Sequence, residues 1–106
     1  MPCQLNGIKM TYRNRTLLKI AQGMPCVMCG NDNGTGVAAH SNLLEHGKGR
    51  GLKAHDGMTA WLCYDCHSEY DQGNKMSREE KRDFILTAIC RTYMQLWDRA
   101  WIQTAV

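Results

Sequence analysis

Four of the six cysteines in this 106-residue chain lie in two C-x-x-C pairs, and this spacing constrains the fold more than any other feature. Each pair can present two thiolates from one tight turn, and two pairs together complete a tetrahedral metal site. Pro25 and Gly30 flank the first pair, as a turn at such a site requires. The spacing therefore predicts a structural zinc ion held by Cys26, Cys29, Cys63 and Cys66.

Other interpretations of these cysteines are a disulfide framework, buried thiols and a redox pair. The start of the chain has no apolar segment typical of an export signal, and no apolar run approaches the ~20 residues needed to cross a bilayer. We therefore expect a cytoplasmic protein, in which the reducing environment disfavours disulfides. Two C-x-x-C pairs outside a thioredoxin pattern are seldom redox-active, so zinc is the favoured interpretation.

The length of the chain predicts one domain spanning residues 1–106, and its patterns favour an α+β fold. Residues 24–73 are rich in Gly, Asn and Asp, with short apolar pieces at 37–39 and 59–62. These pieces predict short strands joined by turns. Because this core segment has little apolar content of its own, we expect zinc binding to supply much of its folding energy.

A helix is expected on each side of this core segment. Residues 11–22 favour a short basic helix that is stopped by a glycine and a proline. Residues 77–103 favour one long amphipathic helix, because apolar side chains recur there at helical spacing. Ser77 and Glu80 are expected to form a capping box at the start of the long helix.

Two histidines occupy positions that carry more specific information. His40 follows the apolar piece at 37–39, and His67 directly follows the fourth zinc cysteine. Here the chain resembles the HNH, or ββα-metal, nucleases, in which a strand ends with a general-base His and a later helix carries metal ligands. It resembles still more closely the YbcO-type nuclease family of prophages. The matching string reads Ala39-His40, Gly47-Lys48-Gly49, Asp56, Cys63-x-x-Cys66-His67, Glu69 and Tyr70-Asp71.

The resemblance implies a small zinc-stabilised ββα-metal core and a metal-dependent DNA endonuclease that acts in phage recombination or on branched DNA. It implies that His40 activates the attacking water and that His67 binds a catalytic Mg²⁺, Mn²⁺ or Zn²⁺ ion. His67 and Asp71 are i and i+4 if a helix starts near the fourth cysteine, so they can share this ion. Asp56 is either another ligand or the residue that orients His40. The chain departs from many HNH enzymes at Ala39, where those enzymes have an Asp ligand.

The charge of the chain is compatible with nucleic acid as a partner. The net charge is +3, which predicts only modest non-specific affinity, so a homodimer would help the protein to bind DNA tightly. A glycine-rich segment at 45–53 carries Lys48, Arg50 and Lys53. These cations either contact DNA phosphates or belong only to a mobile loop.

The residues alone leave several alternatives open. His40 can be a structural histidine or can replace a cysteine at the zinc ion, and His67 can be a surface residue at a helix start. His46 and His55 lie in a polar loop and are expected to be solvated. At the level of function, the rival hypothesis is a non-catalytic zinc module that docks on DNA or on a partner protein. A third hypothesis is an adaptor whose long helix mediates dimerisation.

Overall fold

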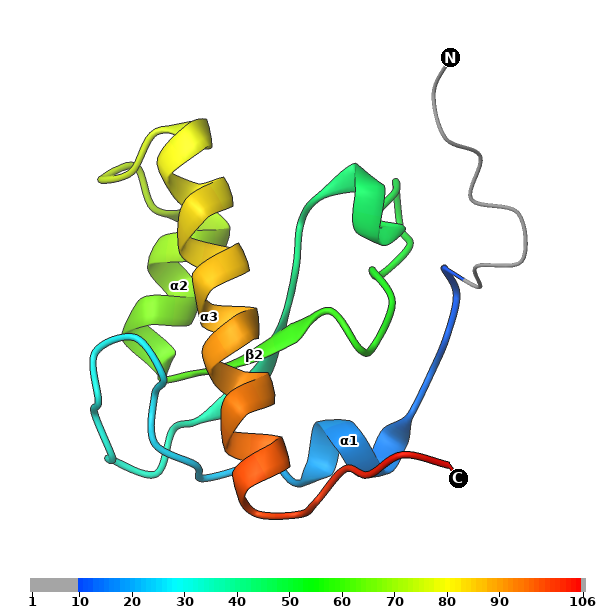
Figure 1. Cartoon of the computed structure of the whole chain (residues 1–106). Coiled ribbons are helices and arrows are strands. Elements are labelled where there is room, and N and C mark those ends of the chain that lie inside the picture. Colours follow the sequence, from blue (N-terminus) through cyan, green and yellow to red (C-terminus); the bar gives the residue numbers. More distant parts are fainter. Residues whose placement is uncertain (1–9, 106) are drawn as a thin grey trace.

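A computed structural model describes residues 10–105 and confirms the α+β fold (Figure 1). In chain order the elements are α1 (Arg15–Lys19), β1 (Val37–His40), the 3-10 turn η1 (Leu44–His46), β2 (Thr59–Leu62), α2 (Tyr64–Gln72) and α3 (Arg78–Asp98). None of the helices in this part of the chain is long and apolar enough to cross a membrane.

The two strands form one antiparallel sheet, in which Val37 lies opposite Leu62 and His40 opposite Thr59. Trp61 of β2 makes two further backbone contacts outside this pairing. Its N–H donates to Thr92 Oγ1 of α3 at 3.0 Å, and its C=O accepts from Val27 N at 3.0 Å. Because these polar groups are all paired, β2 is buried along its whole length between α3 and the first cysteine pair.

Side chains of β2 alternate between two apolar clusters, as the two faces of a strand require. Ala60 and Leu62 pack with Tyr70 of α2 and Ile85 of α3. Trp61 packs on the other side with Ala21, which follows α1, and with Leu96 of α3. Helix α3 contributes to both clusters and packs along β2 of the ββα unit that β1, β2 and α2 form; it lies along the front of the molecule in Figure 1.

The N-terminal helix is shorter than the predicted range of 11–22. It begins after Asn14, whose side-chain oxygen accepts from Leu17 N at 3.0 Å. The residues before Asn14 are held by the loop that leads to β2, because Asp56 N donates to Tyr12 O at 3.0 Å and the Arg13 side chain donates to Ala54 O at 2.9 Å. Tertiary hydrogen bonds thus take these residues out of the helix.

The long helix starts where the sequence predicts and ends earlier than the predicted residue 103. Ser77 and Glu80 form the expected capping box, with hydrogen bonds of 3.1 and 2.8 Å. Ala100 adopts a left-handed backbone with φ 57°, and Trp101 N donates back to Leu96 O at 3.0 Å. This is a Schellman motif, which usually has glycine at the left-handed position. An alanine at this position gave no signal in the sequence.

Candidate metal centres and active site

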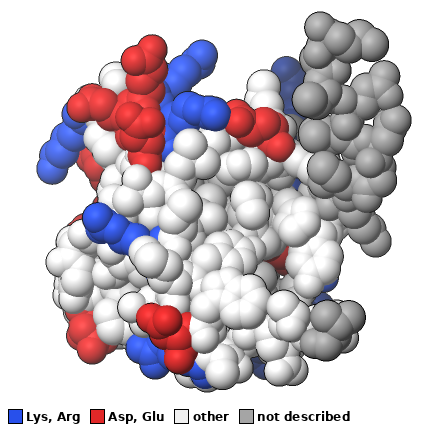
Figure 2. All heavy atoms as spheres, in the orientation of Figure 1, with Lys and Arg blue, Asp and Glu red and all other residues white. Residues whose placement is uncertain are grey.

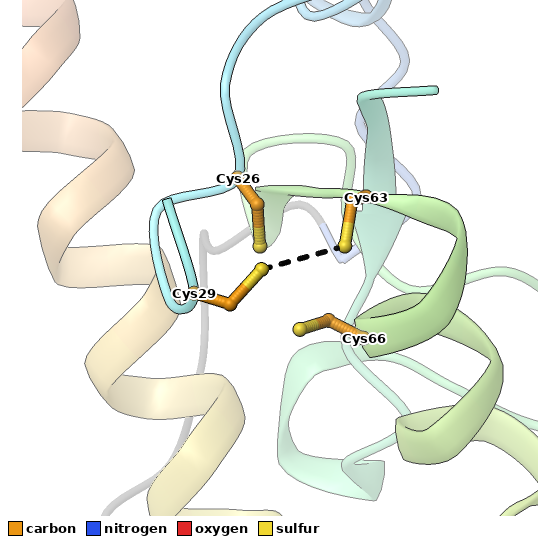
Figure 3. Close-up of side chains that lie close together, drawn as sticks. All are labelled: Cys26, Cys29, Cys63 and Cys66. Atoms are coloured by element: carbon orange, nitrogen blue, oxygen red, sulfur yellow. Dashed lines mark hydrogen bonds between the residues drawn. The ribbon is translucent and has the colours of Figure 1, made fainter. Parts of the chain in front are cut away.

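Four cysteine side chains converge on one point, as Figure 3 shows. Cys26 and Cys29 come from the turn that follows α1, Cys63 is the N-cap of α2 and Cys66 lies in its first turn. All four sulfur atoms lie within 4.8 Å of one another, and Cys29 Sγ is 3.6 Å from Cys63 Sγ. Tetrahedral zinc with bonds of about 2.3 Å separates its sulfur ligands by roughly 3.8 Å. The cluster therefore fits the predicted structural zinc.

The turn that carries the first pair is built for sulfur ligands. Gly30 N donates to Cys26 O at 3.0 Å, and Gly30 has φ +78°, a left-handed conformation that glycine adopts without strain. Asn31 N approaches Cys29 Sγ at 3.4 Å. Burial raises the pKa of the Cys26 thiol, but backbone amides aimed at the sulfur outweigh burial and lower the pKa to about 7. The backbone of the turn thus favours the thiolate form of Cys26, the form that zinc binds.

The second cysteine pair fixes the start of α2 and hence the next candidate pair, His67 and Asp71. His67 Nε2 lies 2.9 Å from Asp71 Oδ2, and about a third of each side chain is exposed, 34% and 35%. Two ligands on adjacent corners of an octahedral Mg²⁺ or Mn²⁺ site, with bonds of about 2.1 Å, lie roughly 3 Å apart. The spacing of these two atoms therefore suits one ion shared between them.

Asn42 is a further residue at this site, and the sequence did not predict its role. Its Nδ2 donates to Asp71 Oδ1 at 3.1 Å, and its backbone N donates to the Tyr70 hydroxyl at 2.8 Å. Asp71 is thus held by His67 on one oxygen and by Asn42 on the other. Asn42 lies two residues beyond β1, and only the packing of α2 against the sheet brings it to Asp71, so no sequence pattern marks it.

His40 forms a second pair at the end of β1. Its Nε2 lies 2.7 Å from Asp56 Oδ1, and the His40 side chain is 19% exposed while that of Asp56 is almost fully buried. Asp56 Oδ2 accepts from Asn14 N at 2.7 Å, and Arg13 lies 3.7 Å from Oδ1. Burial alone would raise the pKa of the Asp56 carboxyl. The hydrogen bonds from His40 and Asn14, with the nearby positive charge of Arg13, lower that pKa below its ordinary value.

The two histidine–aspartate pairs share no ligating side chain with the cysteine cluster or with each other. Among residues 10–105, the four cysteines are the one group of three or more ligating side chains close enough to share an ion. Neither His40 nor His67 therefore replaces a cysteine. Asp56 lies against His40 and does not join His67 and Asp71 as a third ligand. Ala39, where many HNH enzymes have Asp, is fully buried in the core.

The basic segment near η1 is an ordered hairpin. Gly49 and Leu52 exchange two backbone hydrogen bonds of 3.1 Å, so Arg50 stands exposed at the tip of the turn. Lys53 is also exposed and Lys48 is half-buried. These three cations share one projecting hairpin, and none of them contacts either histidine–aspartate pair.

The two loop histidines are half-buried, whereas the sequence suggested that they are solvated. His46 Nδ1 lies 2.7 Å from Ser41 Oγ, and burial lowers the pKa of this imidazole. His55 stacks on Tyr12 with ring centroids 4.7 Å apart. Both histidines thus help to shape the loop between the strands.

Comparison with known proteins relates the chain to a nuclease family. The family model described as "Putative nuclease YbcO" matches residues 15–100, which include both cysteine pairs and both histidine–aspartate pairs. No curated protein and no solved structure matches the chain.

Proposed function

The chain belongs to the YbcO nuclease family, and from this premise we propose that it is a metal-dependent DNA endonuclease of the HNH type. The observation that carries the proposal is the presence of two histidine–aspartate pairs with different environments beside a cysteine cluster that could hold a metal ion. A buried pair suits proton transfer, and a partly exposed pair suits a metal ion that must reach the substrate.

His40 is proposed as the general base. Asp56 accepts a hydrogen bond from His40 Nε2–H, which leaves the Nδ1 lone pair to take a proton from water. As the water loses this proton to Nδ1, its oxygen forms a bond to phosphorus and the bond from phosphorus to the leaving oxygen breaks. Asp56 does not need to accept a proton; it fixes the tautomer and stabilises the imidazolium that forms, as in other His–Asp pairs.

His67 and Asp71 are proposed to hold Mg²⁺, Mn²⁺ or Zn²⁺. Such an ion, when bound, supplies positive charge to the phosphate and the leaving oxygen. Asn42 positions Asp71 through its amide, whereas Ala39 provides no ligand. A site with two protein ligands is compatible with Mg²⁺, which usually keeps several waters.

The hairpin cations and a second copy of the chain are proposed to help bind the DNA substrate. Lys48, Arg50 and Lys53 contact DNA phosphates from their hairpin, and a homodimer would double this weak electrostatic contribution. The resemblance to prophage nucleases favours a recombination intermediate or another branched DNA as substrate, in the cytoplasm of the bacterial host. Residues 1–106 would act as one nuclease domain.

The proposal is tested by incubating protein that carries one zinc ion per chain with plasmid and branched DNA, without added metal or with added Mg²⁺, Mn²⁺ or Zn²⁺. The wild-type chain should cut only with added metal, and His40→Ala should lose at least about 100-fold in rate, the usual contribution of a general base. His46→Ala is the matched control, because His46 is also half-buried and its ring is hydrogen-bonded to Ser41 and not to a carboxylate.

Two outcomes would contradict the mechanism. Equal cutting by the wild type and His40→Ala would mean that His40 is not the base. DNA binding with no metal-dependent cutting of either substrate would instead favour a non-catalytic zinc module.

A further inference from the structure

A groove of about 670 Å³ lies between the segment that follows β1 and the first turns of α3. One side is formed by Asn42, Leu43 and Glu45, and the other by Arg78, Lys81 and Arg82. Figure 1 shows these two parts of the chain, η1 and the start of α3, facing each other at the top of the molecule. The volume is in the range of pockets that hold a small ligand or a short segment of a larger one.

The groove adjoins the proposed catalytic metal pair. Asn42 lines the groove and also donates to Asp71 Oδ1 at 3.1 Å. Tyr70, the residue before Asp71, lines it as well. A polymer bound with one phosphate at His67 and Asp71 would therefore pass directly into this groove.

The charges of the groove favour a polyanion. Its lining has three cations and one acid, Glu45. Arg78 makes no ion pair or hydrogen bond with the described residues, and Lys81 Nζ donates to Gly73 O at 2.7 Å, which leaves its charge without a counterion. Figure 2 shows that charged side chains of both signs gather at this end of α3, whereas the middle of the face below it is largely uncharged.

The one acid in the lining is held by one of the cations. Arg82 Nη1 and Nη2 donate to the two carboxylate oxygens of Glu45 at 2.5 and 2.7 Å, a bidentate pair that joins the two walls. Both side chains remain about half exposed, 44% and 53%. Exposed ion pairs of this kind contribute little to stability, so an exchange of partner costs little. A phosphate presents the same two-oxygen edge to a guanidinium as a carboxylate does.

We propose that this groove binds the DNA strand next to the cleaved phosphate, and that Glu45 occupies on Arg82 the place that a backbone phosphate takes in the complex. The inference rests on the proposed nuclease function for the identity of the polymer. It assigns Arg82, Arg78 and Lys81 to strand binding, in addition to the hairpin cations. Glu45 is then an intramolecular competitor that weakens binding of the strand.

The test measures binding of a labelled single-stranded oligonucleotide by fluorescence anisotropy. All proteins carry His40→Ala so that no DNA is cut, and binding is therefore read independently of cleavage. Arg82→Ala should weaken binding about fivefold near 0.1 M salt, because one lost phosphate contact on a single strand removes about 0.7 from the salt slope. Glu45→Gln should tighten binding, because it frees Arg82.

The two variants remove the same ion pair, so a purely structural role would change binding in the same direction in both. Lys19→Ala is the control, because Lys19 is an exposed cation on α1 at the opposite end of the molecule (Figure 1). The proposal would be overturned if Arg82→Ala and Glu45→Gln changed the affinity for the oligonucleotide in the same direction. It would also be overturned if neither change in affinity exceeded that of Lys19→Ala. So would a poly-glutamate peptide that displaces the oligonucleotide at equal charge concentration, which would indicate an acidic protein partner. If Arg82→Ala weakens binding and Glu45→Gln tightens it, but the chain without His40→Ala cuts no DNA, the groove binds the strand and the proposed nuclease function is rejected.

Discussion

At the scale of single residues, the two histidine–aspartate pairs differ in how tightly their surroundings hold them. Asp56 is buried and bonded on both oxygens, to His40 and to Asn14 N, so the His40 ring has one orientation. Asp71 is partly exposed, and its partners are two side chains, those of His67 and Asn42. A fixed imidazole suits proton transfer, while an accessible carboxylate can change partners when an ion arrives.

The lowered pKa of Asp56 gives a prediction about stability and pH. The folded state holds this carboxyl ionised. Its contribution to the free energy of unfolding is therefore complete above the pKa of Asp in the unfolded chain, about 3.9, and is lost as the pH falls through the lower pKa of the folded state. Asp56→Asn removes this titration. Urea unfolding between about pH 6 and pH 3 should show a flatter decline for the variant than for the wild type. Parallel declines would mean that Asp56 is not held by its partners.

At the scale of elements, α3 is docked on the sheet through one buried hydroxyl. Thr92 Oγ1 accepts from Trp61 N at 3.0 Å and donates to Ala88 O at 2.9 Å. The hydroxyl thus satisfies a strand amide that would otherwise be buried without a partner. The start of α3 could be predicted from Ser77 and Glu80 because capping is local, whereas the docking by Thr92 is tertiary and leaves no pattern in the sequence.

The same division between local and tertiary information applies to the candidate site. The two cysteines of each pair, and His67 and Asp71, are related by short spacings, so the sequence predicted these local arrangements. The meeting of the two cysteine pairs was predicted because a tetrahedral zinc ion takes four ligands. The partner of Asp56 could not be decided from the sequence, because residue 56 meets residue 40 only after the two strands pair.

Thr92→Val should therefore destabilise the protein by about 1–3 kcal/mol, the cost of a buried amide left without an acceptor. Thr87→Val on the same helix is the matched control, since Thr87 is exposed, and its effect should stay within roughly 0.5 kcal/mol. Chemical denaturation of both variants measures the difference. A similar free energy of unfolding for the two variants would show that the hydroxyl of Thr92 does not hold α3 on β2.

At the scale of the whole molecule, the cysteine cluster and the proposed catalytic metal pair share one element, α2. Cys63 and Cys66 lie at the start of α2, and His67 and Asp71 follow on that same helix, Asp71 in its last turn. Zinc would therefore fix the position of the catalytic ligands without taking part in the reaction. The central claim is that the protein has two separate metal sites, one for structure and one for cleavage.

The most direct test measures the zinc content and the Mn²⁺ dependence of DNA cleavage in the same protein samples. His67→Ala should keep one zinc ion per chain, as the wild type does, while its half-saturating Mn²⁺ concentration rises at least about tenfold or its cleavage disappears. Cys29→Ala should lose zinc, stability and cleavage together, whereas Cys90→Ala, which alters an exposed cysteine outside the cluster, should behave as the wild type. Loss of zinc from His67→Ala, or an unchanged Mn²⁺ dependence in that variant, would contradict the account.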